Sequence, residues 1–234
     1  FLVVMSCLGI IIKLLIVKKD LTGKSILVTA SRTEEPIDAV RFLSNRSTGR
    51  MGYAVAEEVF KRGAKVTLIS GPSDLNCSSG INLVKVRTAD EMYKAIKKHF
   101  AKSDALIMTA AVSDFTPGKV SSGKIKKQET ELSLNLKRTP DILREMGKQK
   151  GKKVLVGFAV ETEDEIQNAK SKLKEKNLDI IIVNNPNIKG AGFEVDTNMA
   201  TLIDRKGKAE RLPLMSKKEL AEKIIDRMVK LLNR

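Results

Sequence analysis

Hydrophobic and polar positions change period repeatedly along the chain, which predicts strands and helices in alternation. Short apolar, β-branched runs predict strands at 26–30, 66–70, 83–87, 105–112, 154–160 and 179–184. Apolar residues spaced three or four apart predict amphipathic helices at 51–61, 89–101 and 164–176. Because several of these strands lack polar alternation, the pattern favours an α/β fold with an open, mostly parallel, Rossmann-like sheet covered by helices on both faces.

The C-terminal part follows another pattern. Two short strand-like runs, 200–204 and 210–214, flank Lys206-Gly207 and predict a C-terminal β-hairpin extension. The motif S-x-x-E at Ser216 to Glu219 is a capping box, and it predicts the start of a last helix that continues through Leu231. No internal repeat is visible, so we expect one α/β domain.

The first seventeen residues are almost all apolar, interrupted by Lys13. The run is shorter than the roughly 20 residues that a helix needs to span a bilayer, and it lacks the basic start of a signal peptide. A buried or linker helix is favoured, with a membrane contact as the alternative. Residues 18–24 are polar and predict a linker, which divides the chain into an N-terminal segment, 1–23, and a domain, 24–234.

Composition narrows the range of functions. Lysine and arginine outnumber aspartate and glutamate by 43 to 28, a net charge of +15 that predicts anionic ligands. Cys7 and Cys77 form no C-x-x-C motif, which excludes a cysteine zinc site and favours a reducing, cytoplasmic location. With one histidine, His99, multi-histidine metal chemistry is excluded. Aromatic residues make up 4% and tryptophan is absent, so we expect no nucleic-acid partner.

The stretch between Val112 and Pro140 is rich in glycine, serine and lysine, which predicts an exposed, mobile loop. From Lys119 to Lys153 there are eleven basic and four acidic residues. A solvated charged surface is the ordinary explanation. The position after a buried strand also suits a ligand site, because open α/β sheets bind ligands beyond the carboxyl ends of their strands.

Two segments that follow predicted strands are candidates for anion chemistry. The run 47–52, S-T-G-R-M-G, leads into a helix, where free N–H groups suit an anion, although an ordinary helix cap explains it equally well. It matches neither G-x-G-x-x-G nor a Walker A motif. The second segment is 109–115, with lysines from Lys124 onward. There Asp114 could bind a ribose hydroxyl or a water on Mg²⁺, and Lys124 could bind a phosphate; the alternative is a turn with solvated lysines.

Two further candidates lie later in the chain. Asp141 follows Pro140 and suits a helix N-cap. Lys172 and Lys176 are four residues apart and share a helix face, a pattern that is usually solvated.

Six short motifs occur in a fixed order: R-F-L-S-N-R-S-T-G-R-M-G, A-A-V-S-D-F, K-I-K-K, T-P-D-I-L, G-F-A-V-E-T and K-x-x-x-K-N-L-D. Each is weak alone. Taken together they resemble the phosphopantothenoylcysteine synthetase family (phosphopantothenate–cysteine ligases), and the resemblance extends from about Lys24 to Leu232. In bacteria and archaea, members of this family are commonly the C-terminal half of a bifunctional coenzyme A biosynthesis protein. The domain 24–234 is therefore expected to be such a ligase.

The resemblance implies an activity. Such enzymes join 4′-phosphopantothenate to L-cysteine through an acyl-nucleotide, with Mg²⁺, releasing pyrophosphate and a nucleoside monophosphate. The nucleotide is CTP in the bacterial type and ATP in eukaryotic relatives. It also implies a homodimer and a separate decarboxylase partner. Because the flavin-binding decarboxylase half is missing from this sequence, no flavin is expected.

The resemblance also implies site residues. Nucleotide contacts fall on Ala110, Asp114, Lys124, Pro140, Asp141, Ile142, Leu143, Phe158, Lys172 and Lys176. Lys124 is expected to stabilise the charge that develops as the acyl-nucleotide forms. Asn45 is expected to hold the acyl intermediate, and Arg41 to bind the anionic pantothenate substrate. No metal ligand is implied.

The sequence departs from the family at its first loop, where the run 29–34, T-A-S-R-T-E, replaces an expected glycine-containing turn, A-G-x-T-x-E. Because Arg32 stands in this turn, the substrate contact that the family makes through this loop is not assigned to a residue here. Two other functions are weighed. An NAD(P)-dependent reductase on the same sheet would need the glycine fingerprint that is missing. A basic nucleic-acid-binding protein would need a binding motif and interleaved aromatic residues.

Overall fold

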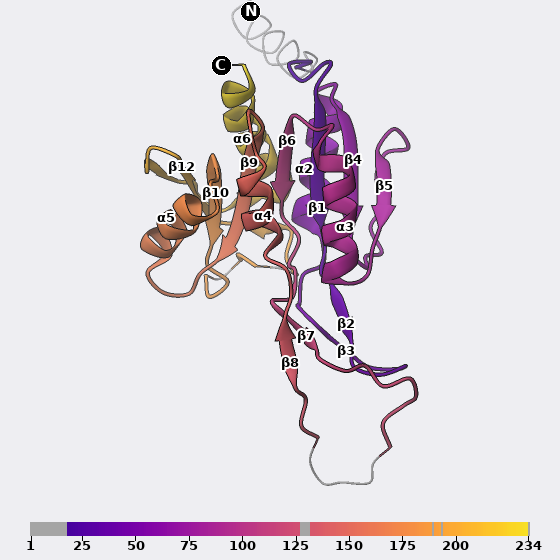
Figure 1. Cartoon of the computed structure of the whole chain (residues 1–234). Helices are drawn as coiled ribbons and strands as arrows, with labels where there is room; N and C mark the ends of the chain where they lie inside the picture. The colour runs from indigo at the N-terminus through magenta and orange to yellow at the C-terminus, as the bar shows by residue number, and fades with distance from the viewer. Residues whose placement is uncertain (1–17, 127–131, 189, 193, 234) are drawn as a thin grey trace, which may run out of the picture.

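The computed structural model describes residues 18–126, 132–188, 190–192 and 194–233, and its centre is one eight-stranded sheet (Figure 1). The strand order is β13-β12-β10-β9-β6-β1-β4-β5. In chain order these strands are β1 (Ser25–Ala30), β4 (Lys65–Ser70), β5 (Asn82–Lys85), β6 (Ala105–Met108), β9 (Val154–Val160), β10 (Ile180–Asn184), β12 (Ala200–Asp204) and β13 (Ala209–Arg211). The six strands from β10 to β5 are parallel, which confirms the predicted fold class.

Helices cover both faces of the sheet. They are α2 (Arg50–Lys61), α3 (Ala89–Phe100), α4 (Ile142–Lys148), α5 (Glu165–Glu175) and α6 (Lys217–Leu232). Alternate residues of each strand point to opposite faces. Val28 of β1 belongs to a core cluster with α2 and α6, whereas its neighbour Leu27 belongs to a second cluster with α3, α4 and α5.

The expected C-terminal hairpin forms from β12 and β13, and it extends the edge of the main sheet because β12 pairs antiparallel with β10. One expectation for the sheet is corrected. The strand expected over 105–112 ends at Met108, because the chain then leaves the sheet. Residues 109–112 consequently lie beyond the carboxyl end of β6, where a ligand can reach their backbone.

Two pairs of very short strands were not expected. They are β2 (Glu34–Pro36) with β3 (Phe42–Ser44), and β7 (Phe115–Pro117) with β8 (Leu136–Arg138). The second pair lies within the stretch expected to be a loop. Both pairs project from the carboxyl end of the sheet (Figure 1), and we call them together the arm.

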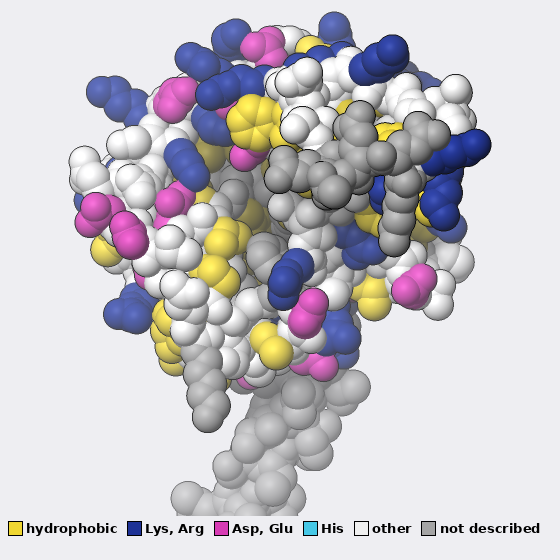
Figure 2. Space-filling view, turned by 90° about the horizontal axis from the view of Figure 1, so that it is seen from below, with side chains coloured by type: hydrophobic (Ala, Val, Ile, Leu, Met, Phe, Trp, Pro, Cys, Tyr) yellow, Lys and Arg dark blue, Asp and Glu magenta, His cyan; other side chains and the backbone are white. Residues whose placement is uncertain are grey.

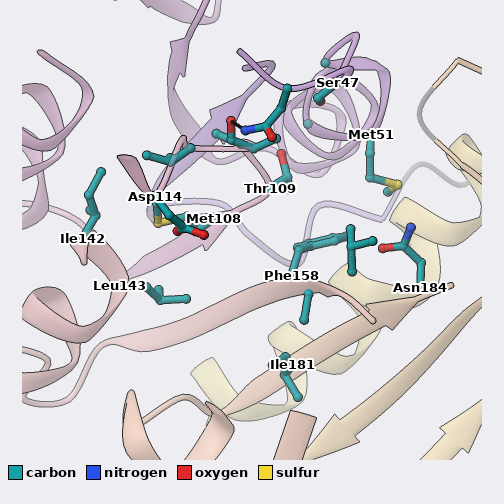
Figure 3. A pocket seen from close by; sticks show the side chains of 18 of the residues that line it. Ser47, Met51, Met108, Thr109, Asp114, Ile142, Leu143, Phe158, Ile181 and Asn184 are labelled. Carbon is teal, nitrogen blue, oxygen red and sulfur yellow. Dashed lines mark hydrogen bonds between the residues drawn. The ribbon is translucent and has the colours of Figure 1, made fainter. Parts of the chain in front are cut away.

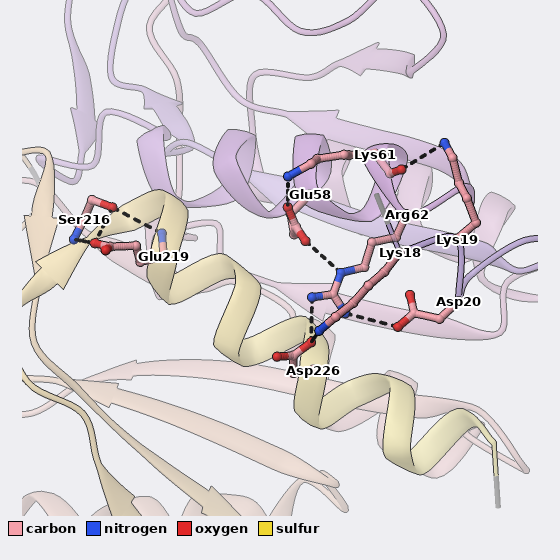
Figure 4. A network of polar contacts seen from close by, with 9 residues as sticks. All are labelled: Lys18, Lys19, Asp20, Glu58, Lys61, Arg62, Ser216, Glu219 and Asp226. Carbon is pink, nitrogen blue, oxygen red and sulfur yellow. Dashed lines mark hydrogen bonds and ion pairs between the residues drawn. The ribbon is translucent and has the colours of Figure 1, made fainter. Parts of the chain in front are cut away.

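Residues 18–24 pack on the domain. The Leu21 side chain is buried in the α2–α6 core, so the predicted linker contributes to the fold. Arg62, after α2, is also buried and pairs with Glu58, Asp20 and Asp226 at 2.7, 3.4 and 2.6 Å (Figure 4). These contacts join residues 18–20, α2 and α6.

Among the described residues, no helix is both long and apolar enough to cross a bilayer. The expectations for residues 1–17 lie outside the described part of the chain.

Candidate functional site

A cavity of about 710 Å³ opens at the carboxyl ends of β6, β9 and β10 (Figure 3). Its walls come from the loop before α2, the segment after β6, the start of α4, the end of α5 and the start of α6. In an open parallel sheet this edge is where helix starts and loop backbones converge, so the position is the one expected for a ligand site.

The first turn of α2 lies very close to Thr109, the residue that follows β6. A Cβ on Gly52 would lie 2.4 Å from Thr109 Oγ1, so only glycine allows this approach. The helix begins after Gly49, whose φ of 87° favours glycine. Asn45 lies at the cavity wall, and its Nδ2 donates to the Ala111 carbonyl at 3.0 Å. These contacts fix the segment after β6 against the loop that carries Asn45.

Charged pairs line the α5 side of the cavity. Asp141 caps α4 by accepting from the Arg144 N–H, as the sequence predicted, and its carboxylate also pairs with Lys176 at 2.9 Å. Lys172 pairs with Glu161 at 2.6 Å. The two lysines are thus held at the cavity rather than spread on a solvated helix face. Their charges suit an anionic ligand that competes for these pairs.

Most of the predicted site residues converge on this cavity. Ten of the twelve line it: Asn45, Ala110, Asp114, Pro140, Asp141, Ile142, Leu143, Phe158, Lys172 and Lys176. They come from five separate stretches of the chain. Whether each contacts a nucleotide or a substrate remains a prediction.

The other two, Arg41 and Lys124, are not among the cavity-lining residues and belong to the arm region. The buried Asp38 carboxylate bonds Arg41 Nε at 3.0 Å and accepts the Ile125 N–H at 3.1 Å. The Arg41 guanidinium and these backbone N–H groups hold the pKa of Asp38 far below its usual range, against the opposing effect of burial. Through Asp38, Arg41 is held beside Ile125, the residue that follows Lys124 in the chain.

Arg32, the departure from the family turn, points to the loop before α2 rather than lining the cavity. Its guanidinium donates to the Ser47 carbonyl at 3.2 Å and lies 3.5 Å from Glu34. It therefore supports a loop that does line the cavity.

Sequence reasoning missed the α6 side of the cavity, which includes Asn184, Asn198 and Lys217. Lys217 Nζ donates to the carbonyls of Gly192, at 2.9 Å, and Val195, and burial lowers its pKa. The available signal was the predicted capping box, because Lys217 directly follows the cap residue Ser216. The two asparagines carry no sequence signal of their own.

Comparison with known proteins gives three findings. A family model described as the DNA/pantothenate metabolism flavoprotein C-terminal domain matches residues 21–232. The coenzyme A biosynthesis bifunctional protein CoaBC of Bacillus subtilis is 45% identical over 212 residues, covering 90% of this chain and 52% of that protein. A protein named cysteine/cysteine sulfinic acid decarboxylase, from an unknown prokaryotic organism, is 47% identical over 220 residues, covering 93% of this chain and 61% of that protein.

The fold agrees with these sequences. The solved C-terminal domain of a coenzyme A biosynthesis bifunctional protein CoaBC superposes with a TM-score of 0.80 at 38% identity, covering 92% of this chain and 99% of that chain. The chain spans roughly half to three fifths of the length of the two curated relatives above. The resemblance read from six short motifs is confirmed, and the chain belongs to the family of DNA/pantothenate metabolism flavoprotein C-terminal domains.

Proposed function

We propose that this chain is a phosphopantothenate–cysteine ligase of coenzyme A biosynthesis, using CTP, with ATP as the other candidate nucleotide. The observation that carries the proposal is the convergence of ten residues, chosen by resemblance, on one cavity. The relatives named for coenzyme A biosynthesis support the same pathway.

The proposed reaction has two steps. The carboxylate of 4′-phosphopantothenate attacks the α-phosphate of CTP, forming an acyl-cytidylate and releasing pyrophosphate. The amine of L-cysteine then attacks the acyl carbon, CMP leaves, and the amine loses a proton. The first step is needed because a free carboxylate has a poor leaving group, whereas a phosphate ester departs readily.

The cavity residues suit these steps. In the proposed complex Lys172 and Lys176 bind the phosphates on the α5 side by exchanging their carboxylate partners, Glu161 and Asp141, for phosphate oxygens. The Asn45 amide is suited to orient the acyl group without reacting with it, because it is uncharged and lies at the cavity wall. Lys124 and Arg41 lie outside the cavity, so their proposed roles require the arm to approach the bound substrate.

Magnesium fits the acidic residues present. Among the described residues no group of three metal-ligating side chains forms a closed site. Mg²⁺ commonly uses one or two carboxylates together with substrate phosphates. Asp114 lines the cavity and its carboxylate makes no hydrogen bond or ion pair within the described residues, so it would hold such an ion, which supplies charge neutralisation at the phosphates.

The homodimer proposal is supported by the surface of the arm. Several large apolar side chains are exposed there, including Val40 at 61%, Phe42 at 42% and Leu136 at 45%. Figure 2 shows hydrophobic side chains among lysines and arginines on the face seen from below. A second copy is the proposed partner, with a separate phosphopantothenoylcysteine decarboxylase acting next in sequence. We propose a cytoplasmic location and expect no flavin in this domain.

The deciding experiment is pyrophosphate release with phosphopantothenate and Mg²⁺, using CTP and ATP separately, with and without cysteine. We expect release that requires phosphopantothenate, and CMP or AMP when cysteine is added. No release with either nucleotide would contradict the proposal. For the reductase alternative, NADPH is expected to leave the melting temperature unchanged.

A further inference from the structure

The parallel strands begin at the pole opposite the cavity (Figure 1), and a row of lysines lies there. The Lys65 N–H donates to the Lys24 carbonyl at 2.8 Å, so the starts of β4 and β1 adjoin. Lys153 Nζ donates to the carbonyls of Ala101, at 3.1 Å, and Ser103, at 2.6 Å, so the segments before β9 and β6 adjoin as well. Because β12 runs antiparallel to β10, the turn after β12 lies at the same pole. We call this surface the basic pole, and its lysines are Lys24, Lys65, Lys102, Lys152, Lys206 and Lys208.

The nearby carboxylates bond inside the domain. Asp104 accepts the Ser25 N–H at 2.8 Å. Asp179 accepts the Leu155 N–H at 2.8 Å and pairs with the buried Lys150 at 2.6 Å. In the part of the chain that the structure describes, the six lysines of the basic pole make no ion pair and no side-chain hydrogen bond. The basic pole is therefore a cationic surface that suits an extended anionic partner.

The apolar N-terminal segment joins the domain at this same pole. Residues 1–17 carry one charge, Lys13, and are followed directly by Lys18 and Lys19. Lys18 pairs with Asp226 of α6 at 3.1 Å, and the final turns of α6 lie at the pole opposite the cavity (Figure 1). The point where the apolar segment enters the domain is thus next to the cationic surface.

We propose that the basic pole docks on an anionic lipid surface and that residues 1–17 insert among the lipids. Lysines near such a surface are attracted to its anionic headgroups, and an apolar segment gains by leaving water. One signal alone gives marginal attachment, whereas an apolar anchor and a basic surface together hold a protein on a membrane. A buried helix, the other explanation of residues 1–17, does not account for the lysines of the basic pole. A nucleic acid would account for the lysines but not for the apolar segment.

Docking in this orientation leaves the cavity open to the solution. The cavity lies at the carboxyl ends of β6, β9 and β10, and the basic pole lies at the amino ends of the same strands. Small molecules therefore reach the cavity while the chain is attached to lipid. Attachment is compatible with any ligand of the cavity, so its test is independent of the proposed ligase activity.

The test is co-sedimentation of the full chain with vesicles of phosphatidylcholine, alone or with phosphatidylglycerol added. We expect binding to the anionic vesicles to be about tenfold tighter and to weaken with added salt, which screens the attraction. Lys102→Gln combined with Lys152→Gln should reduce this binding about tenfold or more, because each lysine near the surface contributes about fivefold. The matched control is Lys85→Gln combined with Lys119→Gln, which removes two exposed lysines at the end of β5 and in the arm. It should change binding by less than about twofold.

Ile11→Glu combined with Leu14→Glu tests the apolar segment. It should also reduce vesicle binding about tenfold or more, without lowering the melting temperature. Equal binding of the unaltered chain to both kinds of vesicle would overturn the inference, as would equal effects of the two lysine pairs in folded variants. A lowered melting temperature for the Ile11 and Leu14 variant, with no vesicle binding by the unaltered chain, would show that the segment packs on protein instead. Saturable binding of duplex DNA in place of vesicles would assign the basic pole to a nucleic acid and likewise overturn the inference.

Discussion

Ser31 adopts a strained backbone conformation in the turn that departs from the family sequence, and a hydrogen bond stabilises it there. Its φ of 70° lies in the left-handed region that favours glycine, the residue that the expected turn contains. Its hydroxyl donates to the Pro72 carbonyl, and its Cβ would be 3.1 Å from one built on Gly49. The hydrogen bond offsets part of the conformational cost, which is about 1–2 kcal/mol for a residue with a Cβ.

Two substitutions at Ser31 separate these contributions. Ser31→Ala keeps the strained backbone and loses the hydrogen bond, so we expect destabilisation by about 1–2 kcal/mol. Ser31→Gly loses the same bond but relieves the strain, so it should be less destabilising than Ser31→Ala. Urea unfolding measures both free energies. A larger loss for glycine than for alanine would contradict the strain argument.

Asn45 tests the second step of the proposed reaction. We expect Asn45→Asp to release pyrophosphate at close to the normal rate while acyl-nucleotide accumulates. A carboxylate cannot donate a hydrogen bond to the acyl oxygen, and it repels the negative charge that develops there as cysteine attacks. Quenched-flow analysis of bound nucleotide after mixing with cysteine measures this. The control is Asn82→Asp, an exposed asparagine of the edge strand β5 that is not among the cavity-lining residues. Rapid formation of the cysteine adduct by Asn45→Asp would refute the assigned role.

Lys124 tests the first step. Lys124→Gln removes the charge proposed to stabilise acyl-nucleotide formation, so pyrophosphate release should fall by about 100-fold or more. Lys119→Gln, a neutralisation in the same segment, is expected to change it less than twofold. Equal rates for Lys124→Gln and the unaltered chain would count against a catalytic Lys124.

Among the elements, the β2–β3 hairpin depends on a single carboxylate. Asp38 is bonded by Arg41 and by backbone N–H groups of Val40, Arg41 and Ile125, and its pKa is lowered. A lowered pKa in the folded state means that this stabilisation is complete above the unfolded value of about 3.9 and is lost as the pH falls below it.

This linkage predicts a pH dependence. The free energy of unfolding should fall as the pH is lowered from 5 to 3, and the fall should be smaller in Asp38→Asn. Asp90→Asn, which removes an exposed carboxylate paired with Lys94, serves as the control. Urea unfolding across this range gives the slopes. Identical slopes for Asp38→Asn and the unaltered chain would refute the assignment.

Arg62 is a single charged residue that joins α2, α6 and residues 18–20, as Asp38 joins the segments of the arm. Removing it leaves Glu58, Asp20 and Asp226 without their shared cation, so Arg62→Ala should destabilise the chain by about 3 kcal/mol. Lys61→Ala removes an exposed ion pair to the same Glu58 and should cost less than about 1 kcal/mol. Similar losses for the two variants would show that burial does not strengthen the Arg62 contacts.

At the scale of the molecule, the central sheet was predictable because most of its strands are apolar runs of four to seven residues between amphipathic helices. The arm was not, because β2, β3, β7 and β8 have three residues each and show no period. The place of β12 beside β10 depends on tertiary pairing, which a local pattern does not contain. Asn184 and Asn198 were missed for the same reason: only the folded chain brings them to the cavity.

The arm also carries a prediction about assembly. If its apolar side chains meet a second copy, sedimentation equilibrium should give twice the chain mass of 25.8 kDa. Val40→Glu combined with Leu136→Glu should give the mass of one chain, because burying those charges opposes association. Ile166→Glu changes an apolar side chain of α5 that is exposed to a similar degree and should leave the mass doubled. A single-chain mass for the unaltered protein would refute the homodimer.

Helix α6 starts at the cavity, where Lys217 lines the wall, and ends at Leu232. Its sixteen residues span about 24 Å at 1.5 Å per residue. Residues 18–20 lie beside its final turns through the ion pair of Lys18 with Asp226, so both ends of the described chain are at the pole opposite the cavity (Figure 1). A sensor surface that captures the chain through a C-terminal tag would therefore leave the cavity mouth facing the flowing solution.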